Sequence, residues 1–522
     1  MIRSLRNIGR LGRAVLVLSQ HDALFPREYL GQVSLGWRLA RRLLVSGRNT
    51  AADEAPGVRL AMALERLGPA YIKLGQILAT RPDIVGADVC QALKQLQDRV
   101  PPFAIETAVA TVEAGLGRSL DQMFRSFGPP VAAASIAQVH RAQTTDEPPR
   151  CVAVKVFRPG IEEEFARDLN AFAFAAKWAE ALSQEARRLR LCALVATLSA
   201  SVALELDLRM EAAAATELAD QMAEEPDFRV PAVDWSRTAT RVLTTEWIEG
   251  VSVGDKQALL DAGHDPKLIA VTVVRSFLVQ ALCGGFFHAD MHQGNLFVDA
   301  EGRLVVVDFG IMGRLDAAMR RFMAETLAGF LARDYRRVAR VHFEAGFVPS
   351  VHSIENFAQA LRAIGEPIFG RTARDVSMAK LLQQLFETTR RFDMELQPQL
   401  VLLQKTMVVV EGVARSLDPD FDIWEASRPV IGEWMADQIG PRAILRDGRT
   451  TLEALLGLTR DLPAVLANLE SVAGMLAGDG VKVHADSIER FARAQSFRIR
   501  HLQIALWLGA VALLILALGT IH

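Results

Sequence analysis

The sequence predicts an α+β protein of two lobes, in which a small lobe carries β-strands and a larger lobe is mostly helical. Two short apolar runs support this prediction. Residues 151–157 form a β-prone run around one lysine, and residues 304–307 form a buried strand that ends at Asp308. A third observation is length, because 522 residues exceed a single ordinary core and favour two or three folding units.

Residues 1–125 are predicted to form a mostly helical extension. Within it, residues 64–80 have the pattern of one helix, because apolar side chains recur at three- and four-residue steps at Leu64, Leu67, Tyr71, Leu74 and Leu78. Lys73 and Gln76 lie three residues apart and therefore share a helical face. Periodicity alone does not separate a functional face from a solvated flank.

The start of this extension has a basic amphipathic pattern. Apolar residues fall at helical steps over residues 2–15, and the other face carries Arg3, Arg6, Arg10 and Arg13. Such a helix can lie on anionic lipid. It can equally pack against the lobes, and the pattern favours neither outcome.

The small lobe is assigned to residues 126–248. Strands are expected near residues 133–143 and 151–157, helices from Glu162 past Glu211, and a further strand over residues 241–250 that leads to a hinge. Residues 249–440 are expected to form the large lobe, and residues 441–500 a charged, amphipathic linker.

The most informative segment lies in the large lobe. Asp290 comes two residues after His288 and five before Asn295, and Asp308-Phe309-Gly310 begins thirteen residues after Asn295. Phosphoryl transfer from a nucleoside triphosphate needs such a set: Asp290 to orient the attacking oxygen, with Asn295 and Asp308 to hold Mg²⁺. The protein-kinase signature has the same order, which predicts a bilobal protein-kinase-like fold. Asp and Asn in turns often only cap backbone groups, but three at this spacing favour the kinase interpretation.

Lys155 supplies the cation that such a site requires. It lies in a strand like the one whose lysine holds the α- and β-phosphates in kinases. Lysine is scarce, with nine lysines against fifty arginines, so a lysine inside an apolar strand is less readily explained as incidental surface charge. The alternative is an edge-strand lysine that protects against aggregation.

Two features of protein kinases are absent from the sequence. No G-x-G-x-x-G loop precedes Lys155; an alanine-rich turn stands there instead. Because alanine adopts positive φ less cheaply than glycine, this loop should be stiffer over the phosphates. No Ala-Pro-Glu triplet follows Asp308, so a peptide-docking activation segment is not indicated.

These motifs together resemble the UbiB family of atypical kinase-like proteins, which is associated with ubiquinone biosynthesis. The resemblance covers nearly the whole chain, from K-x-G-Q at residues 73–76 and the segment 96–102, through the alanine-rich loop, Lys155 and residues 205–211, to the motifs at His288 and Asp308 and to residues 417–421. One departure is Gln293, where the family usually has proline. The chain loses the rigid turn that a proline would give, but it loses no metal or nucleotide ligand.

The resemblance implies roles for individual residues. It makes the helix around Lys73 and Gln76 a cap on the nucleotide lobe, and it counts Lys73 with Asp290 and Lys155 among the catalytic residues. Spacing alone leaves Asp207 and Glu211 as alternative partners of Lys155; the resemblance assigns this pairing to Glu211. It places Glu205 and Asp207 near the cap.

The predicted kinase-like site implies ATP and Mg²⁺ as cofactors. ATP is expected to contact Lys155, the alanine-rich loop and, through its adenine, the hinge. The loop residues are Ala132, Ala133, Ala134, Ser135, Ile136, Ala137, Gln138, Val139 and His140, and the hinge residues are Glu246, Trp247 and Ile248.

Composition limits the classes of binding partner and the cellular compartment that are expected. A net charge of −2 gives no global attraction for nucleic acid. The four cysteines form no C-x-x-C pair, and each lies in an apolar or helical stretch. A disulfide framework or a zinc site is therefore not expected, and a reducing compartment is favoured.

The C-terminal end predicts a membrane anchor. Residues 502–521 are twenty positions without a charged side chain, and as a helix they would cover roughly 30 Å, the thickness of a bilayer core. A buried terminal helix is the alternative. Arginines precede the segment and only His522 follows it. We therefore expect a single transmembrane helix over residues 501–522 in a bacterial inner membrane, with the main body in the cytoplasm.

Three functions remain open. The first is a membrane-anchored, Mg-ATP-dependent atypical kinase or ATPase in ubiquinone biosynthesis that acts on or mobilises lipid-like quinone precursors. The second is a non-catalytic scaffold that binds nucleotide and lipid and organises other enzymes of that pathway. The third is a soluble small-molecule phosphotransferase, against which the Asp-Phe-Gly triplet, the K-x-G-Q helix and the terminal span argue.

Overall fold

The computed structural model describes residues 2–23, 54–79, 85, 87–93, 101–183, 187, 190–369, 388, 391–394 and 397–439. The chain divides into two compact units, Met1–Val430 and Ile431–His522. The second unit is described only over residues 431–439. The predicted linker at 441–500 and the predicted transmembrane helix at 501–522 therefore lie outside the described residues.

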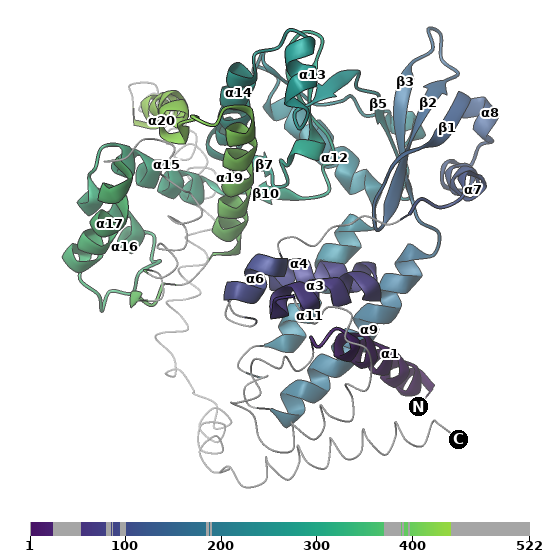
Figure 1. Cartoon of the computed structure of the whole chain (residues 1–522), viewed down its shortest axis with the longest axis horizontal. Coiled ribbons are helices and arrows are strands. Elements are labelled where there is room, and N and C mark those ends of the chain that lie inside the picture. Colours follow the sequence, from purple (N-terminus) through teal and green to yellow (C-terminus); the bar gives the residue numbers. More distant parts are fainter. Residues whose placement is uncertain are drawn as a thin grey trace, which may run out of the picture. The chain divides into compact units, whose positions relative to one another are not determined.

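The small lobe is built on an antiparallel sheet of four strands in the order β1–β2–β3–β5 (Figure 1). The strands are β1 (Phe124–Ala133), β2 (Ala137–Thr144), β3 (Cys151–Phe157) and β5 (Val242–Glu246). The strand expected near residues 133–143 is thus divided, because residues 134–136 turn the chain from β1 into β2. In that turn the Ala134 N–H donates to the Ala137 carbonyl at 2.8 Å.

Alternation along β3 explains a lysine inside an apolar strand. Val152, Val154 and Val156 are fully buried in a core that includes Val112 of helix α7 (Ile105–Leu116) and Met123 of helix α8 (Leu120–Met123). Lys155 lies on the opposite face of the strand. Since β3 lies between β2 and β5, the edge-strand explanation of Lys155 is wrong.

Helices follow β3 in the described part of the chain, as predicted from Glu162 past Glu211. They are α9 (Ile161–Leu182), α11 (Leu191–Glu205) and α12 (Leu208–Gln221). The first turn of α9 carries Glu162, Glu163 and Glu164, which favours a helix start because acidic side chains complement the N-terminal end of the helix dipole. Asp207 is the N-cap of helix α12, and its carboxylate accepts the Arg209 N–H at 3.1 Å.

The single helix predicted over residues 64–80 is wrong. The structure has two helices there, α3 (Pro56–Leu67) and α4 (Pro69–Leu78). Gly68 between them has a φ of 114°, a conformation that glycine adopts readily, and Pro69 has no N–H to continue the ladder of α3. Lys73 and Gln76 therefore lie on a short helix with its own start.

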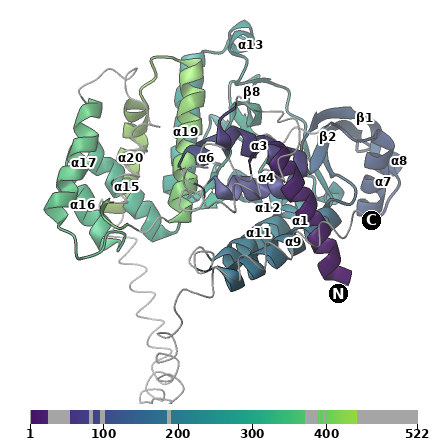
Figure 2. The ribbon, with the colours of Figure 1, turned by 60° about the horizontal axis from the view of Figure 1, so that its bottom comes forward.

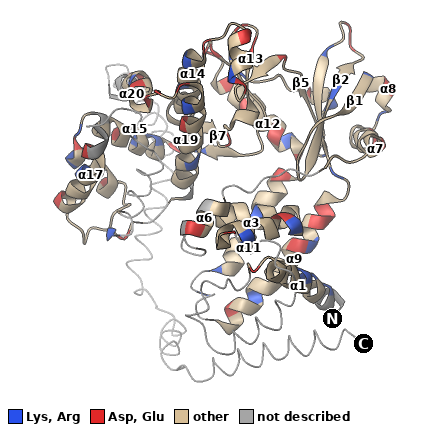
Figure 3. Cartoon of the chain, viewed as in Figure 1, with Lys and Arg blue, Asp and Glu red and all other residues tan. Residues whose placement is uncertain are grey.

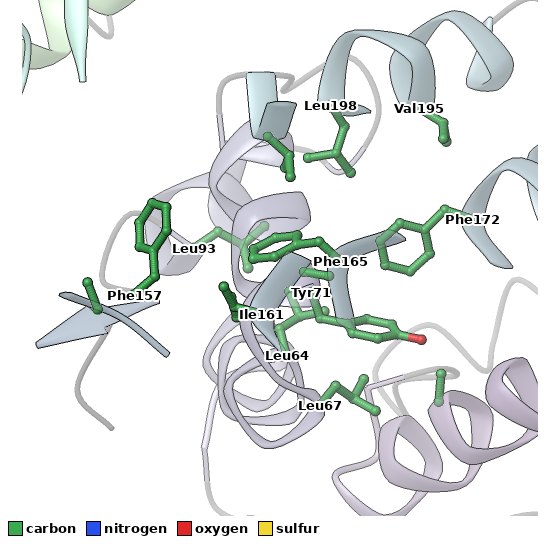
Figure 4. Close-up of a cluster of buried hydrophobic side chains, with 14 of the residues drawn as sticks. Leu64, Leu67, Tyr71, Leu93, Phe157, Ile161, Phe165, Phe172, Val195 and Leu198 are labelled. Atoms are coloured by element: carbon green, nitrogen blue, oxygen red, sulfur yellow. The ribbon is translucent and has the colours of Figure 1, made fainter. Parts of the chain in front are cut away.

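The helical extension and the helices after β3 share one hydrophobic core (Figure 4). Helix α4 contributes Tyr71, whose ring meets Phe172 of α9 edge-on with a centroid distance of 4.8 Å. Helices α3, α4 and α6 (Ala87–Leu93) lie beside α9 and α11 in both ribbon views (Figures 1 and 2). The core reaches the small-lobe sheet through Ala137 and Phe157, so α4 is fixed close to the strand that carries Lys155.

The N-terminal helix also joins this core. Helix α1 (Ile2–Gln20) buries Ala14 and Val17 in it and packs on α9. Arg10 forms an ion pair with Asp168 of α9. Of the two alternatives for this helix, the structure shows packing on the rest of the chain.

The large lobe contains two small sheets and a set of helices. The strands β4 (Phe228–Arg229), β9 (Leu304–Val306), β8 (Leu296–Asp299) and β6 (Gly250–Ser252) form one sheet in that order, and β7 (Phe286–His288) pairs with β10 (Met312–Arg314). The buried strand predicted before Asp308 is confirmed as β9, whose three residues are fully buried. In the described residues, its helices are α13 (Lys256–Asp261), α14 (Pro266–Leu278), η3 (Val279–Gly284), α15 (Ala317–Leu331), α16 (Tyr335–Glu344), α17 (Ile354–Phe369) and α19 (Pro398–Leu417). Helix α20 (Ile423–Ile439) follows and crosses the boundary between the two units.

Among the described residues, the segment Pro266–Gly284 is long and apolar enough to cross a membrane, but 61% of its apolar window is buried inside the protein. A bent pair, α11 with α12, passes the same test when its two helices are taken together. Helix α14 packs closely on α19. Acidic and basic residues are interspersed along the described helices (Figure 3).

Candidate functional site

Lys155 joins three elements that are distant in the sequence. Its Nζ lies 2.8 and 3.0 Å from the two carboxylate oxygens of Glu211 in α12, and 2.9 Å from Oδ1 of Asp308, which follows β9. The side chains of Lys155 and Glu211 are 17% and 9% exposed, whereas that of Asp308 is 51% exposed. The ammonium of Lys155 thus contacts one mostly buried carboxylate, that of Glu211, and one accessible carboxylate, that of Asp308.

Lys155 and Asp308 stabilise each other's charged forms. Burial works against the charge on Lys155, but Asp308 and Glu211 outweigh it and raise the pKa of the lysine. The ammonium of Lys155 in turn holds the pKa of Asp308 below its usual value. Burial raises the pKa of Glu211 to about 7, against the opposing pull of Lys155. Lys155 is therefore a cation and Asp308 an anion at neutral pH.

Asp308 has an unusual backbone that the surrounding loop holds in place. Its φ is 65°, a left-handed conformation that is uncommon for residues other than glycine. The imidazole of His288 fixes this position: Nδ1 accepts the Asp290 N–H at 3.1 Å, so Nε2 carries the hydrogen and donates it to the Asp308 carbonyl at 2.8 Å. Burial lowers the pKa of His288, which keeps the ring neutral. His288 was not among the predicted site residues, although it lies in the same motif as Asp290.

Asp290 and Asn295 are tied together at the turn of the loop. The Asn295 amide donates through Nδ2 to the Asp290 carbonyl at 3.1 Å. An amide that donates through its nitrogen presents its oxygen to other partners, and oxygen is the donor atom that Mg²⁺ prefers. Asn295 Oδ1 and the accessible carboxylate of Asp308 are thus suited to hold Mg²⁺ together with nucleotide phosphates. The Asp290 side chain is half-buried, with Oδ2 at 3.6 Å from the His292 ring.

The alanine-rich loop is held by Arg158, which was not among the predicted site residues. Arg158, just after β3, donates from its N–H to the Ile136 carbonyl at 2.8 Å and from Nε to the Ala134 carbonyl at 3.1 Å. Its Nη2 donates to the Pro101 carbonyl at 2.7 Å. The sequence indicates a role for Arg158 only through its position at the end of the Lys155 strand, one residue after Phe157.

Not every residue predicted to bind nucleotide has its side chain on the Lys155 face. Val139 pairs with Lys155 across β2 and β3, so it lies on that face. Gln138 and His140 are its neighbours in β2 and lie on the opposite face because side chains alternate. Both are buried; Gln138 accepts the Phe103 N–H at 2.9 Å, and His140 Nδ1 lies 2.8 Å from the Gly128 carbonyl. Their side chains fasten the sheet to the segments around it.

Two of the three predicted hinge residues, Glu246 and Trp247, already have partners within the protein. Glu246 forms an ion pair with Arg229 of β4, and its N–H donates to the Ala232 carbonyl at 2.8 Å. The Trp247 N–H donates to the Cys151 carbonyl at 3.1 Å, and the guanidinium of Arg141 lies 5.1 Å from the Trp247 ring centroid. An adenine contact at these residues and at Ile248 stays a prediction.

The cap residues are connected to the site through α11 and α12. Lys73 Nζ lies 2.7 Å from the carboxylate of Glu205, the last residue of α11, and both side chains are mostly buried. Asp207 instead pairs with Arg209, whose Nε lies 2.9 Å from Oδ1. Gln76 is half-buried on α4. The structure thus brings Lys73 to Glu205, and Lys155 to Glu211 and Asp308.

Comparison with known proteins agrees with this geometry. An ABC1 atypical kinase-like domain matches residues 95–342, and a UbiB helical domain matches residues 361–422. A probable protein kinase UbiB from Marinobacter nauticus is 41% identical over 415 residues, which cover 78% of this chain and 76% of the relative. One from Azotobacter vinelandii is 40% identical over 479 residues, which cover 90% and 88%. This chain belongs to the UbiB family.

The fold of this UbiB-family chain also has a relative among solved structures. The Rv3197–erythromycin complex from Mycobacterium tuberculosis matches with a TM-score of 0.50 and 26% identity, over 75% of this chain and 97% of the other. The fold is therefore kinase-like, with mixed helix and sheet. Lys155, Glu211, Asp290, Asn295 and Asp308 all lie in the kinase-like match, whereas α4 lies before it and α19 lies in the UbiB helical match.

Proposed function

We propose that this chain is a membrane-anchored, Mg-ATP-dependent atypical kinase or ATPase that supports ubiquinone biosynthesis. One observation carries the proposal: Lys155 lies between Glu211 and Asp308, with Asp290 and Asn295 on the loop beside them. Membership in the UbiB family supports the same chemistry.

Each residue of the site has a distinct part in this proposal. Lys155, oriented by the bidentate contact with Glu211, would neutralise the nucleotide phosphates. Asn295 and Asp308 would hold Mg²⁺, which neutralises charge on the β- and γ-phosphates when bound. Asp290 would orient the attacking hydroxyl or water and accept its proton.

The acceptor is proposed to be water or a lipid-like quinone precursor rather than a protein. Helix α4 shares a core with the small lobe through Ala137 and Phe157, and the sequence has no Ala-Pro-Glu element for peptide docking. Lys73 and Glu205 fasten α4 to α11 on this side. Other enzymes of ubiquinone biosynthesis are the expected protein partners, and nucleic acid is not.

We place the anchor at residues 501–522, in a bacterial inner membrane with the main body in the cytoplasm. The support is the uncharged stretch 502–521 and the arginines that precede it. The apolar helix Pro266–Gly284 is a weaker candidate because most of its apolar window is already buried.

The test is ADP release by the purified full chain in anionic liposomes with Mg-ATP. Turnover is expected in the wild type and not in Asp308→Asn, since the variant loses the anion that holds the metal. In a deletion strain, wild type should restore ubiquinone, Asp308→Asn should not, and the quinone intermediate that accumulates would identify the step. A scaffold is the better description if Asp308→Asn restores ubiquinone fully.

A further inference from the structure

The loop from His288 to Asn295, called the catalytic loop below, is held by one helix from outside the kinase-like match. Helix α19 (Pro398–Leu417) lies in the UbiB helical match and reaches the loop at Thr406 and at Ser416. These two residues are ten positions apart, so the contacts are roughly 15 Å apart along the helix. They bind the loop on both sides of Asp290, at Ala289 and at Gln293.

Thr406 makes the deeper of the two contacts. It is fully buried, and its hydroxyl lies 3.0 Å from the Ala289 carbonyl and 2.9 Å from the Leu402 carbonyl of its own helix. A hydroxyl has one hydrogen, which is shared between these carbonyls. Ala289 is 1% exposed, so water does not readily reach its carbonyl, and leaving such a group without a donor is costly.

The Ala289 carbonyl belongs to the peptide unit that ends at the nitrogen of Asp290. The N–H of the same peptide unit donates to His288 Nδ1, and the Asp290 carbonyl accepts from Asn295. Two of these three restraints come from within the loop. The third comes from Thr406, 117 residues further along the chain. A rotation of this peptide unit would turn the Asp290 carboxylate, so Thr406 restrains the direction in which that carboxylate points.

Ser416 makes the second contact. Its hydroxyl accepts from Gln293 Nε2 at 2.8 Å and donates to the Val413 carbonyl at 2.7 Å. The Gln293 carbonyl also lies 3.3 Å from the hydroxyl of Ser252 in β6. Gln293 begins the 3₁₀ turn η4 (Gln293–Asn295), so this contact restrains the turn that places Asn295.

We infer that helix α19 is a brace for the catalytic loop and that Thr406 is a positioning residue for Asp290. This inference rests on the proposed phosphoryl-transfer function, and it assigns the UbiB helical segment a direct part in the site. Thr406 touches no reacting atom; it acts on Asp290 through the Ala289 carbonyl.

The test compares Thr406→Val, which keeps the shape but removes the hydroxyl, with Thr406→Ser, which keeps the hydroxyl. Thr111→Val is the matched control, because Thr111 is also a buried helical threonine but its hydroxyl donates within α7, to Thr107 at 2.9 Å. The full chain in anionic liposomes is measured for Mg-ATP affinity, ADP release and amide hydrogen exchange over residues 289–295.

Thr406→Val should lower kcat about tenfold, because a small misplacement of a catalytic group is costly, with little change in Mg-ATP affinity. It should also speed amide exchange in the loop. Thr406→Ser and Thr111→Val should both resemble the wild type. Wild-type exchange and turnover in Thr406→Val would overturn the brace, and so would equal losses in Thr406→Val and Thr406→Ser.

The test of the α19 contact remains decisive in two further cases. If Thr406→Val does not fold, Ser416→Ala at the exposed end of the helix replaces it, and the brace requires faster exchange at residues 293–295. If the wild type releases no ADP, the proposed function fails, but amide exchange still decides whether α19 holds the loop. Loss of Mg-ATP binding in parallel with turnover would indicate general damage and contradict a positioning role.

Discussion

Lys73 of the cap helix pairs with Glu205, and Glu205 stands six residues before Glu211, the partner of Lys155. Only Leu206 and the helix cap Asp207 separate Glu205 from the start of α12. Lys73 and Lys155 are therefore joined by two ion pairs and one short piece of chain. We therefore expect a change at Lys73 to act on the site through the position of α12.

The first prediction concerns this cap pair. Lys73→His weakens the contact with Glu205 and should change nucleotide affinity, permit autophosphorylation and reduce ubiquinone in cells. Glu205→Gln should have a similar effect, and the double variant should be little worse than either single one, because both remove the same contact. Additive losses would contradict the pairing. If Lys73→His changes neither the nucleotide affinity nor the ubiquinone level, the helix around Lys73 does not act as a cap.

The second prediction concerns the stiffness of the alanine-rich loop. The wild type should phosphorylate added proteins weakly or not at all. Ala134→Gly adds backbone freedom where Arg158 and Ala137 now hold the turn, so it should alter nucleotide affinity and permit autophosphorylation. Radiolabel transfer from ATP measures both. Strong phosphorylation of added proteins by the wild type would rule out a restraining loop and cap.

The third prediction concerns anchoring. A chain that ends before Leu502 should move from the membrane fraction to the soluble fraction. Helix α1 packs on α9 and commits Arg10 to Asp168, which leaves less of its basic face for lipid. Any residual binding through α1 should therefore weaken in salt. A truncated chain that stays fully bound after a high-salt wash would show that residues 502–521 are not the anchor.

Much of the site could be predicted from the sequence because its residues lie in short motifs. The strand around Lys155 and the spacing of Asp290, Asn295 and Asp308 each express a local pattern, and the fold brings Lys155 and Asp308 together across 153 residues. Gly68-Pro69 is a local signal for a helix break, but the apolar periodicity used to predict one helix over residues 64–80 does not take it into account. Alternation along β2 could have shown that Gln138 and Val139 lie on different faces.

The long-range contacts had no local signal. A threonine in an apolar helix, such as Thr406, has the same sequence pattern whether it bonds its own helix or a loop. Likewise, Lys73 and Gln76 share a face, but only the packing of α4 near α11 shows that Lys73 meets Glu205. Partners of this kind are set by tertiary packing and not by spacing along the chain.

The fourth prediction concerns stability against pH. His342 is buried between Phe322 and Phe357, with Nδ1 at 2.8 Å from the Val338 carbonyl, and burial lowers its pKa from 6.5 to about 4. Below pH ~6.5, His342 is protonated in the unfolded chain but stays neutral in the folded chain. Stability from this group is thus complete above that pH and lost as the pH falls toward 4, by about 3 kcal/mol at most.

The control for this prediction is His342→Gln, which does not titrate. Thermal unfolding of the full chain in detergent at pH 7.5 and at pH 5 should show a larger fall for the wild type than for the variant. Equal falls in the two proteins would mean that His342 does not contribute to acid sensitivity.

The fifth prediction tests the Mg-ATP site itself, through nucleotide binding by Asp308→Asn. Asp308 is the accessible carboxylate beside Lys155, so its replacement removes the anion that holds the metal and should leave the fold intact. Fluorescent-nucleotide titration with and without Mg²⁺ measures the difference directly, with unfolding temperature as the control. We predict Mg-dependent affinity in the wild type and none in Asp308→Asn at an unchanged unfolding temperature; equal Mg-ATP affinity in the two proteins would contradict the site.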